Sequence, residues 1–274
     1  GVVGWPLAQS LSPLLHNTAF STLHMPALYQ RWEVAPENFA AFVQSVRVLG
    51  IRGCSVTIPH KTHLQPLLDE VSPLAQRTGA VNTLYWKDKR LCGDNTDVAG
   101  FLAPLSQISL AGESVLLLGA GGAARAAAAG LTSLPGQKRP AIVYVTTPSD
   151  ASHLPLAEEF GLVPLLWKNR HEPEARLVIN ATPLGMRGKA EMESPFDFSR
   201  CPSPSGGRSL AYDIVYNPLE TRFLREAGRV GRKCLSGLEM FFGQANAQFT
   251  LWTGRPLPPE ARSALEAALA HPVA

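Results

Sequence analysis

Hydrophobic and polar positions alternate with two periods through the first hundred residues. Strand-like apolar runs, "PALYQRWEV" and "IRGCSVTI", alternate with helical patterns, "PENFAAFVQSVRVLG" and "PHKTHLQPLLDEV". Alternation of this kind is typical of βαβ units. It predicts an α/β domain over residues 1–100, with a largely parallel sheet.

A second series of strands and helices follows residue 100. The run "SVLLL" ends in glycines and precedes a helix of small residues, and "AIVYVT", the helical "LPLAEEFG" and "ARLVINATPLGM" come next. These segments predict a doubly wound domain over residues 101–236. The remaining residues, 237–274, include "PPEARSALEAALA", which predicts a terminal helix with proline in its first turn. We expect these C-terminal helices to pack back on the first domain.

Composition narrows the class of protein. Of the 274 residues, 45% are hydrophobic and 17% charged, as in a globular protein with a sizeable core. The net charge of +3 is spread along the chain without a basic run, which argues against nucleic acid as a partner. No run of about 18 apolar residues predicts a membrane span, and the start "GVVGWP" lacks the regions of a signal peptide. Four scattered cysteines form no metal or disulfide pattern, so we expect a cytoplasmic protein without a metal.

A glycine-rich turn joins the first strand of the second domain to its helix. Its residues are Gly119, Ala120, Gly121, Gly122, Ala123 and Ala124. In a dinucleotide site, Gly119 permits the tight turn, Gly121 lets the backbone approach a pyrophosphate, and Ala124 allows close helix packing. The turn therefore predicts dinucleotide binding.

The residues at the end of the next strand, "AIVYVT", do not determine whether the dinucleotide is NAD or NADP. NAD sites usually have an acidic residue there and NADP sites often have arginine. This chain has Thr146, Thr147, Pro148, Ser149 and Asp150. Hydroxyl and backbone N–H groups could hold a 2′-phosphate, whereas Asp150 could instead meet a ribose.

Polar residues stand in apolar surroundings at four places in the first domain. They are Ser10 and Ser12 in "QSLSPLLH", Thr57 and Lys61 in "SVTIPHK", Asn82 in "GAVNTL" and Asp97 in "GDNTDVAGF". Singly, each has a structural explanation: Ser12 and Asp97 as helix N-caps, Asn82 as a turn residue. The two serines, beside a helix N-terminus, would also be a suitable receptor for a carboxylate.

With "NATPLGM" and "GLEMFFGQANAQF", the order of these motifs resembles the shikimate dehydrogenase family, from Gly4 to about Thr253. The resemblance implies a two-domain enzyme of aromatic amino-acid biosynthesis. Such an enzyme reduces 3-dehydroshikimate reversibly with NADP bound to a Rossmann domain. It would act on a small molecule, as a monomer or homodimer.

The same resemblance implies roles for individual residues. Lys61 and Asp97 match the catalytic pair. The positions that match substrate contacts are Ser10, Ser12, Thr57, Asn82, Tyr216 and Gln244. The positions that match cofactor contacts are Gly119, Ala120, Gly121, Gly122, Ala123, Thr146, Thr147, Asn180, Thr182, Ile214, Gly237 and Met240.

Two positions depart from the family pattern. Ser55 replaces the usual asparagine before the V-T-x-P turn, and Thr146-Thr147-Pro148 replaces a segment that normally carries arginine. The second departure keeps NAD open as the cofactor of a quinate or shikimate dehydrogenase, although Ser12 favours shikimate over quinate. A further alternative is a non-catalytic shikimate-binding regulator, which would not need both Lys61 and Asp97.

Lysine and aspartate suit the chemistry that the resemblance implies. Hydride transfer to a ketone produces an alkoxide that an acid must protonate, and the reverse reaction needs a base. We expect Lys61 to be this acid and base. Partial burial would lower its pKa from about 10.4, and a carboxylate beside it would oppose that change. Asp97 would share its hydrogen bonds.

Overall fold

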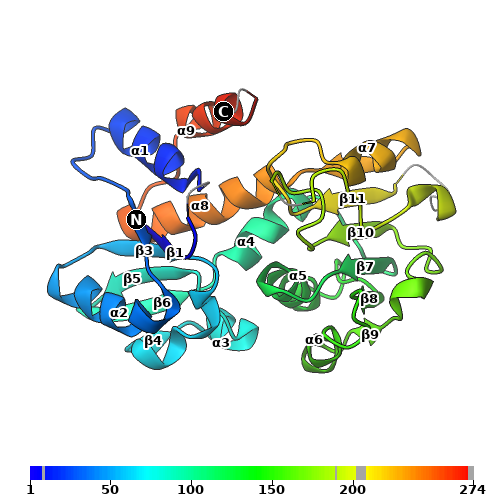
Figure 1. Ribbon diagram of the computed structural model, residues 1–274, viewed down its shortest axis with the longest axis horizontal. Coiled ribbons are helices and arrows are strands. Elements are labelled where there is room, and N and C mark those ends of the chain that lie inside the picture. Colours follow the sequence, from blue (N-terminus) through cyan, green and yellow to red (C-terminus); the bar gives the residue numbers. More distant parts are fainter. Residues whose placement is uncertain (8–9, 189, 202–207, 271–274) are drawn as a thin grey trace. The chain divides into compact units, whose positions relative to one another are not determined.

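The protein is described by a computed structural model that covers residues 1–7, 10–188, 190–201 and 208–270 (Figure 1). The chain forms two compact units. The first unit contains residues 1–99 together with the segment that starts at Phe242, and the second contains Gly100–Phe241. Each unit has its own six-stranded sheet. Within the described residues, no helix is both long and apolar enough to cross a membrane.

The sheet of the first unit is mixed. Its strands are β1 (Val2–Gly4), β2 (Arg31–Glu33), β3 (Gly53–Val56), β4 (Glu70–Val71), β5 (Thr83–Lys87) and β6 (Arg90–Asp94), in the order β2-β1-β3-β5-β6-β4. Strand β1 is parallel to β2 and β3, but β5 is antiparallel to both β3 and β6. Asp88 and Lys89, which join β5 to β6, both have positive φ, as a two-residue hairpin turn of type I′ requires. The expectation of a largely parallel sheet did not include this hairpin.

Helices surround this sheet. They are α1 (Ser12–Thr22), α2 (Phe39–Val48), α3 (Pro73–Thr78), α9 (Pro259–Ala270) and the larger part of α8 (Gly237–Thr253). Helix α2 buries Phe39, Val43 and Val46 against the core, at the spacing of one helical face. In Figure 1, α1 and α9 lie side by side, and their residues are in contact.

The helix expected over "PHKTHLQPLLDEV" does not form. Its place is taken by two short 3₁₀ turns, His60–Thr62 and Gln65–Leu67. Pro66 explains the interruption, because proline has no N–H to donate and its ring clashes with the carbonyl one turn earlier. Lys61 therefore lies in a tight turn, not in the first turn of a long helix.

The sheet of the second unit is entirely parallel. Its strands are β7 (Ser114–Leu118), β8 (Ile142–Thr146), β9 (Val163–Pro164), β10 (Leu177–Asn180), β11 (Leu210–Asp213) and β12 (Lys233–Leu235), in the order β12-β11-β10-β7-β8-β9. Counted from β7, this is the Rossmann order. Strands β7 and β10 are apolar along nearly their whole length, as expected of parallel strands covered on both faces. The prediction of a doubly wound sheet is confirmed.

Helices cover both faces of the second sheet (Figure 1). They are α5 (Gly122–Ser133), α6 (Leu154–Phe160) and α7 (Arg222–Arg229), and α4 (Asp97–Leu102) leads into the unit. The second unit also has the 3₁₀ turns Ala103–Leu105, Trp167–Asn169 and Phe198–Arg200, and the first unit has one more at Pro36–Asn38. The small residues of α5 allow close packing, since four successive alanines, 126–129, are fully buried. The glycine-rich turn thus stands at the carboxyl end of the central strand β7.

Candidate active site

A lysine and an aspartate form an ion pair in the first unit. Lys61 lies in the turn after β3, and Asp97 is the first residue of α4. Lys61 Nζ donates to Asp97 Oδ2 at 2.6 Å, and the two side chains are 20% and 10% exposed. Charge-assisted bonds of this length are among the stronger hydrogen bonds. The pair is therefore largely, but not fully, shielded from water.

Asn82 supplies the second bond to the carboxylate. Its Nδ2 donates to Asp97 Oδ1 at 2.8 Å, while its Oδ1 accepts from the backbone N–H of Thr96 at 2.8 Å and from Thr83 Oγ1 at 2.7 Å. A backbone N–H can only donate, so the amide oxygen must face Thr96 and the amide nitrogen must face Asp97. The structure thus brings together three residues that the sequence singled out separately.

The turn before α4 holds Asp97 in place. Asn95 Oδ1 accepts from the Asp97 N–H at 3.1 Å, and Asn95 Nδ2 donates to Thr78 Oγ1 and to the Ala80 carbonyl at 2.9 and 3.0 Å. The backbone of Lys61 is tied to the same region, because its carbonyl accepts from Val81 N–H at 2.8 Å. Both carboxylate oxygens of Asp97 accept from side chains, Oδ2 from Lys61 and Oδ1 from Asn82, so the side chain does not act as an N-cap.

The serines near the N-terminus differ from one expectation. Helix α1 begins at Ser12, and its N-cap residue, Leu11, makes no side-chain capping bond. The reading of Ser12 as the N-cap is therefore wrong. Ser12 is buried, and its N–H donates to Ser10 Oγ at 3.4 Å. Ser10 Oγ therefore meets the first N–H group of α1.

Thr57 and Gln244 lie on two other elements of the first unit. Thr57 follows β3 directly and packs on Gly4, where an added Cβ would lie 2.4 Å from Thr57 Cγ2. Gln244 lies in α8 and is half-buried. Both residues belong to the unit that carries Lys61 and Asp97.

The glycine-rich turn of the second unit has the geometry that a pyrophosphate needs. Gly119 has φ +113°, and a Cβ there would lie 2.8 Å from the Ala181 carbonyl oxygen. Gly121 and Gly122 are exposed, and a Cβ on either would meet no atom within 4 Å. They open helix α5, whose first N–H groups and dipole favour an anion. The turn therefore fits a dinucleotide.

The tip of β8 carries hydroxyls in place of arginine. Thr146 is fully buried, whereas Thr147 Oγ1 lies 3.0 Å from His153 Nδ1 and accepts from Ser152 Oγ at 3.0 Å. Burial lowers the pKa of His153, which keeps it neutral near pH 7. Asp150 Oδ1 accepts from the Trp167 N–H at 2.5 Å, so this carboxylate already has a backbone partner.

The turn after β10 is organised by Asn180. Its Nδ2 donates to the Leu184 carbonyl at 3.0 Å and to Asp213 Oδ1 at 2.9 Å, and its Oδ1 accepts from Thr182 N–H at 2.9 Å. Both amide hydrogens are thereby used, and the residue is fully buried. Asn180 shapes this turn from within, and Thr182 is the more accessible of the two predicted cofactor residues.

Asp213 lies beneath this turn at the end of β11. It accepts from Thr221 Oγ1, from Val215 N–H and from Asn180 Nδ2. Burial raises its pKa to about 7, while the three donors act in the opposite direction. The motif search did not single out Asp213, although it stands next to Ile214 in "YDIVYNPLET".

The remaining cofactor-side residues gather around the start of α8. A Cβ on Gly237 would lie 2.2 Å from the Ile214 carbonyl oxygen, so only glycine fits there. Met240 is buried. Tyr216, expected beside the substrate, belongs to the second unit, where its ring stacks on Phe241 with 4.6 Å between centroids. Burial raises the pKa of Tyr216, so its hydroxyl keeps its proton near pH 7.

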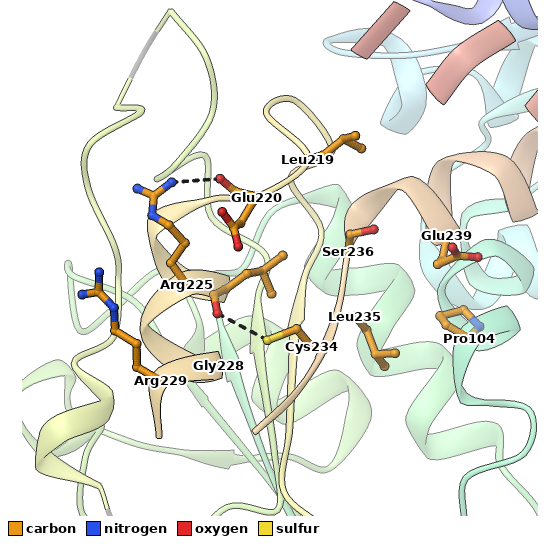
Figure 2. Close-up of a pocket in the computed structure, with 11 residues that line it drawn as sticks. Pro104, Leu219, Glu220, Arg225, Gly228, Arg229, Cys234, Leu235, Ser236 and Glu239 are labelled. Carbon is orange, nitrogen blue, oxygen red and sulfur yellow. Dashed lines mark hydrogen bonds between the residues drawn. The ribbon is translucent and has the colours of Figure 1, made fainter. Parts of the chain in front are cut away.

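The second unit also has a pocket of about 830 Å³ (Figure 2). Its walls come from α7, from β12 and from the start of α8. Arg225, Arg229 and Glu239 are among the residues that line it, and Cys234 Sγ donates to the Leu224 carbonyl at 3.3 Å. None of the residues predicted to bind substrate or cofactor lines it.

Residues that the motifs did not single out complete the first-unit site. Thr83, Asn95 and Thr96 are buried and bond the predicted residues directly. Their signal was present in "VNT" and "DNTD", where polar residues adjoin Asn82 and Asp97. Gln248, one helical turn beyond Gln244, lies in "GLEMFFGQANAQF", but the motif implied no role for it.

The fold and these two groups of residues define a class: a two-unit α/β protein with a dinucleotide-type turn and a buried Lys–Asp pair. The model of the shikimate dehydrogenase substrate binding domain matches residues 2–84, and that of the shikimate 5′-dehydrogenase C-terminal domain matches residues 237–261. Known relatives extend this match to nearly the whole chain.

A protein of Pelobacter propionicus named shikimate dehydrogenase (NADP(+)) is 52% identical over 271 residues, or 98% of this chain and 95% of that protein. A crystal structure of the Thermus thermophilus enzyme in complex with NADP(H) and shikimate has a TM-score of 0.84 and 40% identity, with 98% of both chains covered. The Listeria monocytogenes enzyme, in complex with shikimate and NAD, also has a TM-score of 0.84 but 27% identity, with 97% and 95% covered. The chain belongs to the shikimate dehydrogenase family.

Proposed function

We propose that this protein catalyses the reversible, NADP-dependent reduction of 3-dehydroshikimate to shikimate in the synthesis of aromatic amino acids. The observation that carries the proposal is the shielded Lys61–Asp97 pair, held by Asn82, in a chain whose relative over 98% of its length is named shikimate dehydrogenase (NADP(+)). A regulator that only bound shikimate would have no use for this pair.

Lys61 is the group that moves the proton. NADP, when bound, supplies or accepts the hydride. The Lys61 ammonium gives a proton to the oxygen of the reacting carbonyl, and in reverse the amine takes it from the hydroxyl. Asp97 keeps Nζ in place through its bond of 2.6 Å, and Asn82 keeps the carboxylate in place.

The polar residues of the first unit give selectivity. Ser10 and Ser12 bind the carboxylate of the substrate, and Thr57, Asn82 and Gln244 bond its ring hydroxyls or its carboxylate. Tyr216 is a further residue that we expect near the substrate. A site built to bond hydroxyls rejects analogues that lack them, because buried donors and acceptors would lose their partners. Asn82 is suited to this role since Asp97 takes only one of its two amide hydrogens.

The second unit binds the dinucleotide. The segment of Gly119, Ala120, Gly121, Gly122 and Ala123 holds the pyrophosphate at the N-terminus of α5. Thr146 and Thr147 lie on the adenosine side, where hydroxyl and backbone N–H groups hold the 2′-phosphate in place of the usual arginine. Asn180, Thr182 and Ile214 line the cofactor side, and Gly237 and Met240 approach the nicotinamide. We place the enzyme in the cytoplasm, as a monomer or homodimer with a small-molecule substrate.

The test is the absorbance at 340 nm of purified protein with shikimate, run with NADP and with NAD, and repeated with quinate. We expect the fastest reduction with NADP and shikimate. Faster reduction of NAD would mean that the Thr146-Thr147 tip marks a change of cofactor. Absence of reduction under every condition would contradict the proposal and favour a binding protein.

A further inference from the structure

A second set of buried polar residues lies in the first unit, and the family resemblance gives none of its residues a role. Tyr29 OH donates to Ser55 Oγ at 2.6 Å, and Ser55 Oγ donates to Gln248 Oε1 at 2.7 Å. Burial raises the pKa of Tyr29, so its hydroxyl keeps the proton that it donates. The exposed fractions of Tyr29, Ser55 and Gln248 are 2%, 8% and 1%.

Gln248 connects this set to strand β5. Its Nε2 donates to the Asn82 carbonyl at 3.2 Å and to Thr83 Oγ1 at 3.0 Å. An amide nitrogen has two hydrogens, so both are used. The partners lie 166 and 165 residues away along the chain, because Gln248 comes from α8.

The bonds continue in one direction to the ion pair. Thr83 accepts from Gln248 and donates its single hydroxyl hydrogen to Asn82 Oδ1 at 2.7 Å. Asn82 then donates to Asp97, which accepts from Lys61. Each donor in this series determines the orientation of the next group. We call the seven residues the Gln248 network: Tyr29, Ser55, Gln248, Thr83, Asn82, Asp97 and Lys61.

We propose that Gln248 is a positioning residue for the Lys61–Asp97 pair, with Ser55 and Tyr29 as its support. The proposal rests on the proposed function, since it concerns the same reaction. The proposal also explains Ser55, which stands where the family usually has asparagine. Its hydroxyl donates to Gln248 and accepts from Tyr29. Ser55 therefore acts through Gln248.

The first experiment replaces Gln248 by methionine, which keeps the length of the side chain and removes the amide. Errors of about 1 Å in the position of a catalytic group cost up to about 10²-fold in rate. We expect Gln248→Met to lower kcat with shikimate by about tenfold and to leave KM for NADP unchanged. Thr250→Val, an exposed change in the same helix, is the matched control and should leave kcat unchanged.

A double-mutant cycle separates positioning from a merely structural role. If Gln248 acts through Thr83, the variant Gln248→Met/Thr83→Val should lose no more kcat than the worse of its two single variants. Additive losses would overturn the proposal, as would a Gln248→Met variant that melts at a lower temperature but keeps wild-type kcat at 25 °C.

A second variant covers the case in which Gln248→Met does not fold. Tyr29→Phe removes one hydroxyl from the far end of the Gln248 network and should lower kcat at least twofold. Wild-type kcat in this variant would then overturn the proposal.

An NMR measurement makes the test independent of turnover. We expect the ¹⁵N and ¹H signals of the Asn82 side-chain amide to shift in Gln248→Met but not in Thr250→Val. Unchanged Asn82 signals in Gln248→Met would overturn the positioning role even if the enzyme were active. If the wild-type protein oxidises no shikimate, the proposed function is contradicted. The NMR comparison still tests whether Gln248 positions Asn82, because it does not depend on turnover.

Discussion

Lys61 is the single residue on which the proposed chemistry depends most directly. Acid–base groups usually contribute about 10²–10⁴-fold to rate, so Lys61→Met should lower kcat by this factor. Circular dichroism and a thermal melt would check that the fold persists. Lys168→Met, an exposed lysine in the second unit, serves as the control. Turnover close to wild type in Lys61→Met would exclude the assignment.

Gly119 makes a second prediction at the scale of one residue. Alanine there would have an unfavourable φ of +113° and a Cβ 2.8 Å from a carbonyl oxygen. Strained conformations of this kind cost about 1–3 kcal/mol, so we expect Gly119→Ala to unfold at lower urea concentration and to bind NADP more weakly.

Gly136→Ala is the control for this change, because its Cβ would meet no atom within 4 Å. NADP titration followed by fluorescence and urea denaturation would measure both effects. Equal stability and equal affinity in the two variants would show that the turn tolerates a side chain.

The sequence predicted which polar residues lie together better than it predicted how they bond. Lys61, Asn82 and Asp97 meet as their motifs implied. Ser12, in contrast, follows the N-cap and does not form it, because the end of a helix depends on the backbone geometry of the residue before. Gln248 could not be foreseen, since its bonds join residues 165 or more positions apart.

At the scale of elements, the local sequence pattern predicted a helix or strand correctly where burial of apolar side chains alone determines the element. The strand expected at "SVLLL" is β7 residue for residue, because buried parallel strands are continuous apolar runs. The segment after residue 59 failed, since an apolar period alone predicted a helix that Pro66 interrupts. The sequence did not predict the β5–β6 hairpin, because its turn residues, Asp88 and Lys89, have positive φ although neither is the glycine that usually indicates such a turn.

Thr221 gives a prediction for helix α7. Its side chain accepts from Leu224 N–H as the N-cap and donates to Asp213. Loss of an N-cap costs about 0.5–2 kcal/mol, so Thr221→Val should lower the free energy of unfolding by at least this amount. Ser45→Ala, an exposed change within α2, should alter it by less than about 0.5 kcal/mol. Urea denaturation would compare them, and equal losses would refute the cap.

At the scale of the whole molecule, Asp213 should make stability depend on pH. Its pKa rises from an ordinary value of 3.8 to about 7 in the folded protein. The folded state therefore binds the proton more tightly than the unfolded chain does. This stabilisation is complete below about pH 4 and is lost as the pH rises to about 7.

Replacement of Asp213 by asparagine should remove that dependence. We expect the decline in unfolding free energy between pH 4 and pH 7 to be smaller in Asp213→Asn than in wild type, as measured by urea denaturation at several pH values. Glu158→Gln, an exposed change in α6, should keep the wild-type slope. Parallel slopes in wild type and Asp213→Asn would contradict the raised pKa.

The division of the first unit between two parts of the chain has a consequence for synthesis on the ribosome. The unit needs residues 1–99 and the segment from Phe242, with about 140 residues between them. At roughly 5–20 residues per second, the nascent first segment waits on the order of ten to thirty seconds for its completion. The Rossmann unit emerges whole in that interval. We therefore expect it to fold first, and the Lys61–Asp97 pair to be ordered only when Gln248 has left the exit tunnel.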